Sequence, residues 1–253
     1  MSDTFCVIPW TQLAVKPNGS VRTCCLMSNS PLKEKGQIGF NLGKDSIYDG
    51  WNSSLQTSIR KDLLDGIQNI NCKTCWEKEK VGLSSKRQFS NKLFKDHVTE
   101  NIAREYTDDL GNTLLEPISY DLRFGNLCNL KCVMCHPDSS SNWVSDYVKI
   151  FNEEKDWKFD WYEYEKFWED LENNISSIKH VYMCGGEPLL IERHYYFLEK
   201  CVKSGNSKNI ILEYDSNITI VKDEVLDFWK QFKEVQMRAS IDDYGDQNDY
   251  IRY

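Results

Sequence analysis

Apolar and polar positions in the second half of the chain follow two periods. Residues 119–124 alternate apolar and polar side chains, and residues 178–183 form a short apolar run, so both segments are predicted to be strands. Further strands are expected at 209–214 and 235–241. Apolar residues between them recur at helical spacing. This alternation of strand and helix predicts an α/β fold with a parallel sheet and right-handed crossovers.

The first third has shorter apolar runs. The runs at 12–15 and 21–24 flank a Pro-Asn-Gly turn, which predicts a β-hairpin. Leu55, Ile59 and Leu63 predict a helix that ends near Gly66. A charged helix is expected up to about residue 98, with Phe89, Leu93 and Phe94 as its buried face.

One segment between the first two predicted strands is unusually aromatic. Residues 156–172 carry many charges together with Trp157, Trp161 and Trp168. We expect an inserted or extended helix here that packs these rings into the core, although contact with a substrate is the alternative.

Composition narrows the class of protein. The 253 residues carry a formal charge of −8 and contain no basic run, which argues against binding to a nucleic-acid backbone. The chain begins without a secretory pattern and has no apolar run of membrane-spanning length, so we expect a cytoplasmic protein. Ten cysteines in such a protein indicate metal or redox use rather than disulfides.

Three of these cysteines, Cys128, Cys132 and Cys135, lie within eight residues after the strand at 119–124. Thiolate is the usual ligand of iron–sulfur clusters, and a loop this tight can hold one face of a four-iron cube. The fourth iron would remain open, which is a feature of catalytic rather than structural metal sites. A zinc knuckle or three buried thiols are the alternatives, but His136 is poorly placed as a fourth zinc ligand.

A second motif, Gly185-Gly186-Glu187-Pro188, follows the strand at 178–183. Two glycines at a strand end allow the backbone to approach a ligand closely. Glu187 offers a carboxylate to a cationic group. Alone, this turn is modest evidence for a ligand-binding site, and it becomes specific only because it follows the cysteine triple in the sequence.

Polar residues also follow the next two predicted strands, namely Ser216 with Asn217, and Ser240. Ligands of parallel sheets bind at the carboxyl ends of the strands. The cysteine loop, the glycine turn and these residues are all expected at that edge. Capping of the strand ends is an equally good explanation for each of the three residues taken alone.

Together, the C-x3-C-x2-C triple and the Gly-Gly-Glu-Pro turn resemble the radical S-adenosylmethionine (SAM) superfamily, from about residue 119 onward. The resemblance implies a [4Fe–4S] cluster on the three cysteines, with SAM chelating the open iron through its amino and carboxylate groups. One electron would cleave SAM to methionine and a 5′-deoxyadenosyl radical, which abstracts hydrogen from a substrate. An electron donor such as flavodoxin or ferredoxin would act as partner.

The same resemblance implies roles for single residues. Gly185, Gly186 and Glu187 would hold the amino group of SAM. The carboxylate or ribose would contact Ser216, Asn217 and Ser240. Met134 would lie against adenine, with core packing as the alternative.

A second set of cysteines lies in the first third of the chain: Cys6, Cys24, Cys72 and Cys75. Spacing alone leaves a structural zinc site open beside an iron–sulfur cluster. The hairpin that ends in cysteine, followed by a Trp-Asn helix and C-x2-C, resembles the twitch or SPASM module of radical SAM proteins, which implies an auxiliary iron–sulfur cluster. Cys25 is the alternative to Cys24, because neighbouring side chains on a strand point to opposite faces. The module usually follows the barrel, whereas here it precedes it.

We therefore expect three parts: a cysteine-rich α+β module at 1–98, a linker at 99–117 and a radical SAM core at 118–253. Only four strands are predicted in the core, so the TIM-like barrel would be partial, either truncated or completed by a partner. Its exposed sheet edge predicts marginal behaviour in isolation. By resemblance the substrate is a peptide or protein side chain. A non-catalytic iron–sulfur or zinc scaffold and an electron-transfer protein are the rival functions.

Overall fold

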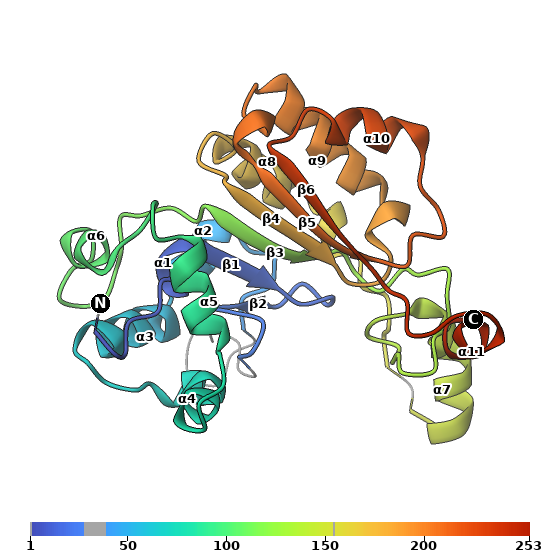
Figure 1. The fold of residues 1–253 in the computed structure, drawn as a ribbon, viewed down its shortest axis with the longest axis horizontal. Coiled ribbons are helices and arrows are strands. Elements are labelled where there is room, and N and C mark those ends of the chain that lie inside the picture. Colours follow the sequence, from blue (N-terminus) through green and yellow to red (C-terminus); the bar gives the residue numbers. More distant parts are fainter. Residues whose placement is uncertain (1, 28–38, 154) are drawn as a thin grey trace.

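The computed structural model describes residues 2–27, 39–153 and 155–253. A six-stranded sheet with the order β2-β1-β3-β4-β5-β6 forms its centre (Figure 1). β1 and β2 pair antiparallel, and all other neighbouring strands are parallel. The strands are β1 Gln12–Val15, β2 Val21–Arg22, β3 Ser119–Arg123, β4 His180–Cys184, β5 Ile211–Ser216 and β6 Glu234–Ala239. The prediction of a mixed α/β fold with a partial, mostly parallel barrel is confirmed.

The α-helices alternate with the core strands and cluster near the N-terminal hairpin (Figure 1). Their bounds are α1 Ile8–Thr11, α2 Ile47–Trp51, α3 Ser54–Leu64, α4 Lys73–Lys80, α5 Lys86–Leu93, α6 Glu100–Glu105, α7 Val144–Phe151, α8 Glu165–Asn173, α9 Glu192–Lys203, α10 Asp223–Trp229 and α11 Asp246–Ile251. Short 3-10 turns are η1 Ile70–Cys72, η2 Ser141–Trp143, η3 Trp161–Glu163, η4 Pro188–Leu190 and η5 Ser207–Asn209. None of the helices in the described ranges is long and apolar enough to cross a bilayer.

The N-terminal hairpin extends the sheet of the core. β1 pairs with β3, with Ala14 opposite Asp121, so the sheet is continuous from residue 12 to residue 239. The segment at 99–117 contains α6 and a bridge between Thr107 and Thr113. Hydrogen bonding therefore joins the cysteine-rich module directly to the first core strand.

Helices α8, α9 and α10 cover one face of the sheet (Figure 1). The main hydrophobic cluster fills that interface, with Tyr120, Leu122, Phe167, Val181 and Leu212 all buried. A second cluster joins the N-terminal helices around Phe5, Trp10 and Ile59, among other residues. Burial of apolar side chains at about 25 cal/mol per Å² is the main driving force for both clusters.

Two predictions about aromatic side chains need correction. Residues 156–172 do not form one helix: a loop precedes η3 and α8, because the rings pack on several sides rather than along one stripe. Trp157, Trp161 and Trp168 are nevertheless buried, as expected. In α5 the predicted buried face is wrong for Phe89 and Leu93, whose side chains are 59% and 38% exposed, while Phe94 is buried just beyond the helix.

The other face of the sheet is polar. Side chains of residues two apart on a strand share a face, and the pairing register aligns Arg22, Ala14, Asp121, Tyr182 and Glu213 in one row across five strands. We call this surface the polar face, made of Gln12, Ala14, Arg22, Ser119, Asp121, Arg123, His180, Tyr182, Cys184, Ile211, Glu213, Asp215, Glu234, Gln236 and Arg238.

Ion pairs on the polar face predict a dependence of stability on pH. His180 (3.0 Å) and Arg238 both pair with Glu213 and lower its pKa from 4.5 to about 2. Because the folded-state pKa is depressed, the stabilisation is complete above the unfolded value and is lost as the pH falls through about 2. We expect Glu213→Gln to destabilise the protein by about 2 kcal/mol at neutral pH and by much less in acid. Thermal unfolding of both proteins from pH 6 to pH 2 measures this.

Glu199→Gln is the matched control, because Glu199 forms only an exposed pair with Lys203. Its difference from wild type should stay small across the series. A constant difference for Glu213→Gln at all pH values would contradict the prediction.

Candidate functional site

The cysteine loop starts where β3 ends, at the carboxyl edge of the sheet. Cys132 is buried, and Cys128 and Cys135 are half-buried. All three line a cavity of about 240 Å³, together with Gly185 and Gly186. The structure thus brings the two motifs, which are about fifty residues apart in sequence, to one site.

The glycine turn packs directly against the cysteine loop. The amide of Gly186 donates to the carbonyl of Gly125 (3.2 Å), and the amide of Glu187 donates to that of Leu127 (2.7 Å). A Cβ at position 186 would overlap the Leu127 carbonyl. Glycine at position 186 is therefore required by the close approach of two backbone segments, in addition to any ligand.

Glu187 is almost fully buried and its carboxylate is bonded within the protein. It accepts hydrogen bonds from the Ser216 hydroxyl (2.8 Å), the Asn217 amide (2.8 Å) and the Leu189 amide (3.1 Å). The Ser216 hydroxyl also accepts from the Ile218 amide (2.9 Å). Glu187 and Ser216 therefore tie the glycine turn to the end of β5, which sequence reasoning did not foresee.

Three further residues are predicted to contact SAM, namely Asn217, Ser240 and Met134. Asn217 lines the cavity and its side-chain nitrogen lies 3.9 Å from Cys128 Sγ. Ser240 also lines the cavity. Met134, on the cysteine loop, is 54% exposed and so is not a core residue.

Sequence reasoning missed Arg252, which follows α11 and lines the same cavity. The chain end lies across the cysteine loop, where the Val133 amide donates to the Ile251 carbonyl (2.9 Å). One Arg252 nitrogen lies 4.0 Å from Cys132 Sγ, and another pairs with Asp242 (2.6 Å). No local pattern marks this arginine, because it is far from both motifs in sequence.

Four further cavity residues come from the polar face: Arg123, Tyr182, Cys184 and Asp215. Because side chains alternate along a strand, the sequence pattern could have predicted that these four residues share one face of the sheet. Cys184 is a buried thiol, and the structure places it at the wall of this cavity.

The thiols of the triple are close enough to influence each other. Burial raises the pKa of Cys135 to about 11, and the charges of Cys132 and Cys128 contribute to the increase. Burial also raises the pKa of Cys128. Both thiols are therefore protonated at neutral pH in the free protein, and metal binding would release their protons.

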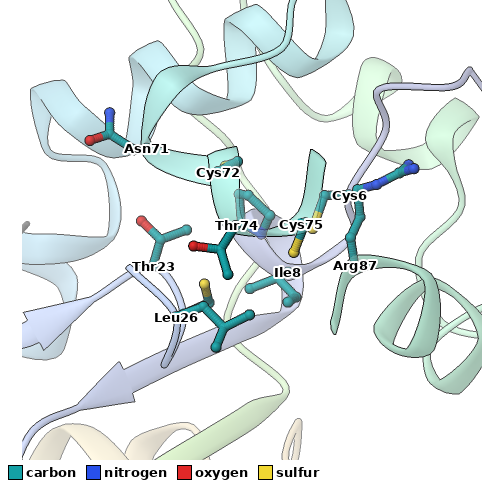
Figure 2. A pocket seen from close by; sticks show the side chains of 11 residues that line it. Cys6, Ile8, Thr23, Leu26, Asn71, Cys72, Thr74, Cys75 and Arg87 are labelled. Atoms are coloured by element: carbon teal, nitrogen blue, oxygen red, sulfur yellow. The ribbon is translucent and has the colours of Figure 1, made fainter. Parts of the chain in front are cut away.

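The N-terminal cysteines Cys6, Cys24, Cys72 and Cys75 line a smaller cavity of about 30 Å³. Figure 2 shows Cys6, Cys72 and Cys75 around this space, with Arg87 at its side. They come from the start of the chain, η1 and α4, while Cys24 follows the hairpin. Cys25 does not line this cavity; burial raises the pKa of its thiol, and the charges that act on it are those of Asp121, Lys86 and Arg123.

Burial dominates the chemistry of this group as well. It raises the pKa of Cys24 to about 12 and that of Cys72 to about 11, with contributions from the other thiols. In the part of the chain that the structure describes, no three His, Cys, Asp or Glu side chains are arranged to ligate a single metal ion. Four converging thiols are nevertheless a donor set that suits an iron–sulfur cluster.

Two family models match the chain. A SPASM model, an iron–sulfur cluster-binding domain, matches residues 6–76, and the Radical SAM superfamily model matches residues 122–252. No curated protein and no solved structure matches the chain. Both models imply iron–sulfur clusters, and the second implies SAM as a cofactor. With more than half of its residues matched, the chain belongs to the radical SAM superfamily and carries an N-terminal SPASM domain.

Proposed function

We propose that this protein is a radical SAM enzyme in which Cys128, Cys132 and Cys135 hold a [4Fe–4S] cluster. The supporting observation is that these cysteines and the glycine turn line one cavity at the carboxyl edge of the sheet. When bound, the cluster and SAM supply a 5′-deoxyadenosyl radical that abstracts hydrogen from the substrate. We propose a peptide or protein side chain as that substrate.

The residues of the chain would bind and orient SAM. The amides of Gly186 and Glu187 are already bonded to the cysteine loop, so the backbone carbonyls of the turn are the acceptors suited to the amino group of SAM. Arg252 is a cation suited to the SAM carboxylate, and Asn217 and Ser240 offer polar contacts beside it. Glu187 holds the turn in position through Ser216 and Asn217.

Release of 5′-deoxyadenosine tests the proposal. The purified protein is reconstituted anaerobically with iron and sulfide, and then mixed with SAM and dithionite. We expect iron and sulfide to be incorporated and 5′-deoxyadenosine to form. A cluster without release of 5′-deoxyadenosine would instead support a non-catalytic scaffold or an electron-transfer protein, and zinc in place of iron would contradict both cluster assignments.

We also propose that Cys6, Cys24, Cys72 and Cys75 hold an auxiliary iron–sulfur cluster. Their convergence on one cavity supports this assignment, as does the SPASM match. Cys24→Ser should therefore lose about half of the reconstituted iron, if both clusters contain four irons. Cys25→Ser is the matched control and should retain the iron content of wild type.

Iron and sulfide analysis, with the visible absorption spectrum, measures this difference. Loss of iron in Cys25→Ser but not in Cys24→Ser would reverse the assignment of the ligand. If both variants retain the iron content of wild type, neither hairpin cysteine is a ligand of the auxiliary cluster.

We propose a cytoplasmic location and flavodoxin or ferredoxin as the source of electrons. All ten cysteines are free in the structure, which suits a reducing compartment.

A further inference from the structure

Several cations lie on or beside the polar face of the sheet, near the cavity. Three carboxylates of this face have cationic partners: Asp121 pairs with Arg123 (3.4 Å), and Asp215 (2.5 Å) and Glu213 both pair with Arg238. Two nearby cations, Arg22 and Lys16, have no carboxylate within ion-pair distance among the described residues.

Arg22 is the most unusual of these residues. Only 9% of it is exposed, and its Nε has no hydrogen-bond partner. One terminal nitrogen donates to the Val21 carbonyl at 3.4 Å, which is a long hydrogen bond. Burial lowers the pKa of Arg22, but a guanidinium stays charged at neutral pH. A buried and unpaired cation is costly, so its retention calls for a partner outside the protein.

Lys16 and Arg123 extend the same positive region toward the cavity. Lys16 is half-buried; burial lowers its pKa, and the charges of Arg22 and Arg123 lower it further. Lys16 is thus close enough to both arginines to be repelled by them, and the charge of Asp138 opposes this effect on its pKa only in part. Arg123 and Pro17, the neighbour of Lys16, both line the cavity that holds the cysteine triple.

We propose that Arg22, Lys16 and Arg123 bind a carboxylate of the substrate beside the SAM cavity. This inference rests on the proposed function, since the carboxylate would orient the substrate toward the radical. Carboxylates are the ordinary anionic groups of peptides, and a guanidinium binds them through paired hydrogen bonds. An acidic peptide is therefore the class of substrate that fits this group of three cations.

Binding of small carboxylates tests the proposal without turnover. The reconstituted protein with SAM, but without reductant, is titrated calorimetrically with N-acetylglutamic acid α-amide and with its neutral isostere, N-acetylglutamine amide. We expect the glutamate probe to bind about tenfold more tightly or better. N-acetylalanine, whose carboxylate is C-terminal, distinguishes a chain end from an acidic side chain: tighter binding of either carboxylate than of the neutral probe supports the site and identifies the source. If neither carboxylate probe binds more tightly than the glutamine probe, the proposal is overturned, as it is by a clear preference for N-acetylphosphoserine amide.

Arg22→Met removes the charge with little change in volume. We expect it to weaken binding of the glutamate probe about tenfold or more, and to raise the melting temperature of the ligand-free protein by about 3 °C or more. A purely structural arginine would give the opposite change in stability. Arg22→Lys keeps the positive charge but lacks the planar guanidinium that makes paired hydrogen bonds, so its affinity for the glutamate probe should be intermediate.

Arg104→Met is the matched control, because Arg104 is exposed, pairs with Glu100 and does not line the cavity. It should leave the affinity for the probe unchanged. A lower melting temperature together with unchanged binding in Arg22→Met would refute the assignment. Release of 5′-deoxyadenosine without carboxylate binding would refute this inference alone, whereas binding without release would refute only the proposed function.

Discussion

Replacement of Cys132 by alanine is expected to abolish release of 5′-deoxyadenosine from SAM. Cys132 is the central and most buried thiol of the triple. The two thiols that remain could ligate only two irons, whereas a [4Fe–4S] cluster with one open iron needs three thiolate ligands. The variant should also lose about half of the reconstituted iron, because the auxiliary site remains intact. Product analysis and iron content, measured on the same preparation, check both expectations.

Cys201→Ala is the matched control for this experiment. Cys201 is fully buried on α9 in the main hydrophobic cluster and belongs to neither group of ligands. It should retain iron and product formation at the level of wild type, after a small loss of stability. Wild-type release of 5′-deoxyadenosine by Cys132→Ala would show that the proposed cluster site is incorrect.

Replacement of Gly186 by alanine should have the second largest effect. The added Cβ would overlap the backbone carbonyl of Leu127, and a backbone atom cannot move aside as the end of a side chain can. Separation of the two loops would break the hydrogen bonds from Gly186 and Glu187 to the cysteine loop. We expect a loss of about 3 kcal/mol in stability, and a failure to cleave SAM because both halves of the site are displaced.

Gly50→Ala is the matched control for the glycine. Its Cβ would meet its nearest neighbour, Val21, at an ordinary contact distance of 3.5 Å, and the residue lies within α2. Alanine favours a helix, so stability should be unchanged or slightly higher. Thermal unfolding and the product assay distinguish the two variants. Normal stability and SAM cleavage in Gly186→Ala would show that the loops need not touch.

Much of the fold could be predicted from local patterns. The four core strands were placed correctly to within a few residues, because alternation of side chains and short apolar runs reflect burial on a sheet. The aromatic segment at 156–172 was misjudged, since large rings can fill space around a loop as well as along a helix. Phe89 was misjudged because periodicity does not reveal whether a neighbour covers that face.

The sequence by itself determined the two groups of cysteines and the order of strands and helices. These features are local: thiolate ligands need short spacings, and strand ends carry the loops between them. They were sufficient to indicate the superfamily, which the family models confirm.

Only the tertiary structure decided which distant groups meet. It bonded Glu187 to Ser216, placed Arg252 beside Cys132 and buried Arg22 without a carboxylate. Such contacts join residues that are far apart in the sequence, so no local pattern encodes them. They arise because parallel strands bring their carboxyl ends to one edge and because the N-terminal hairpin continues the same sheet.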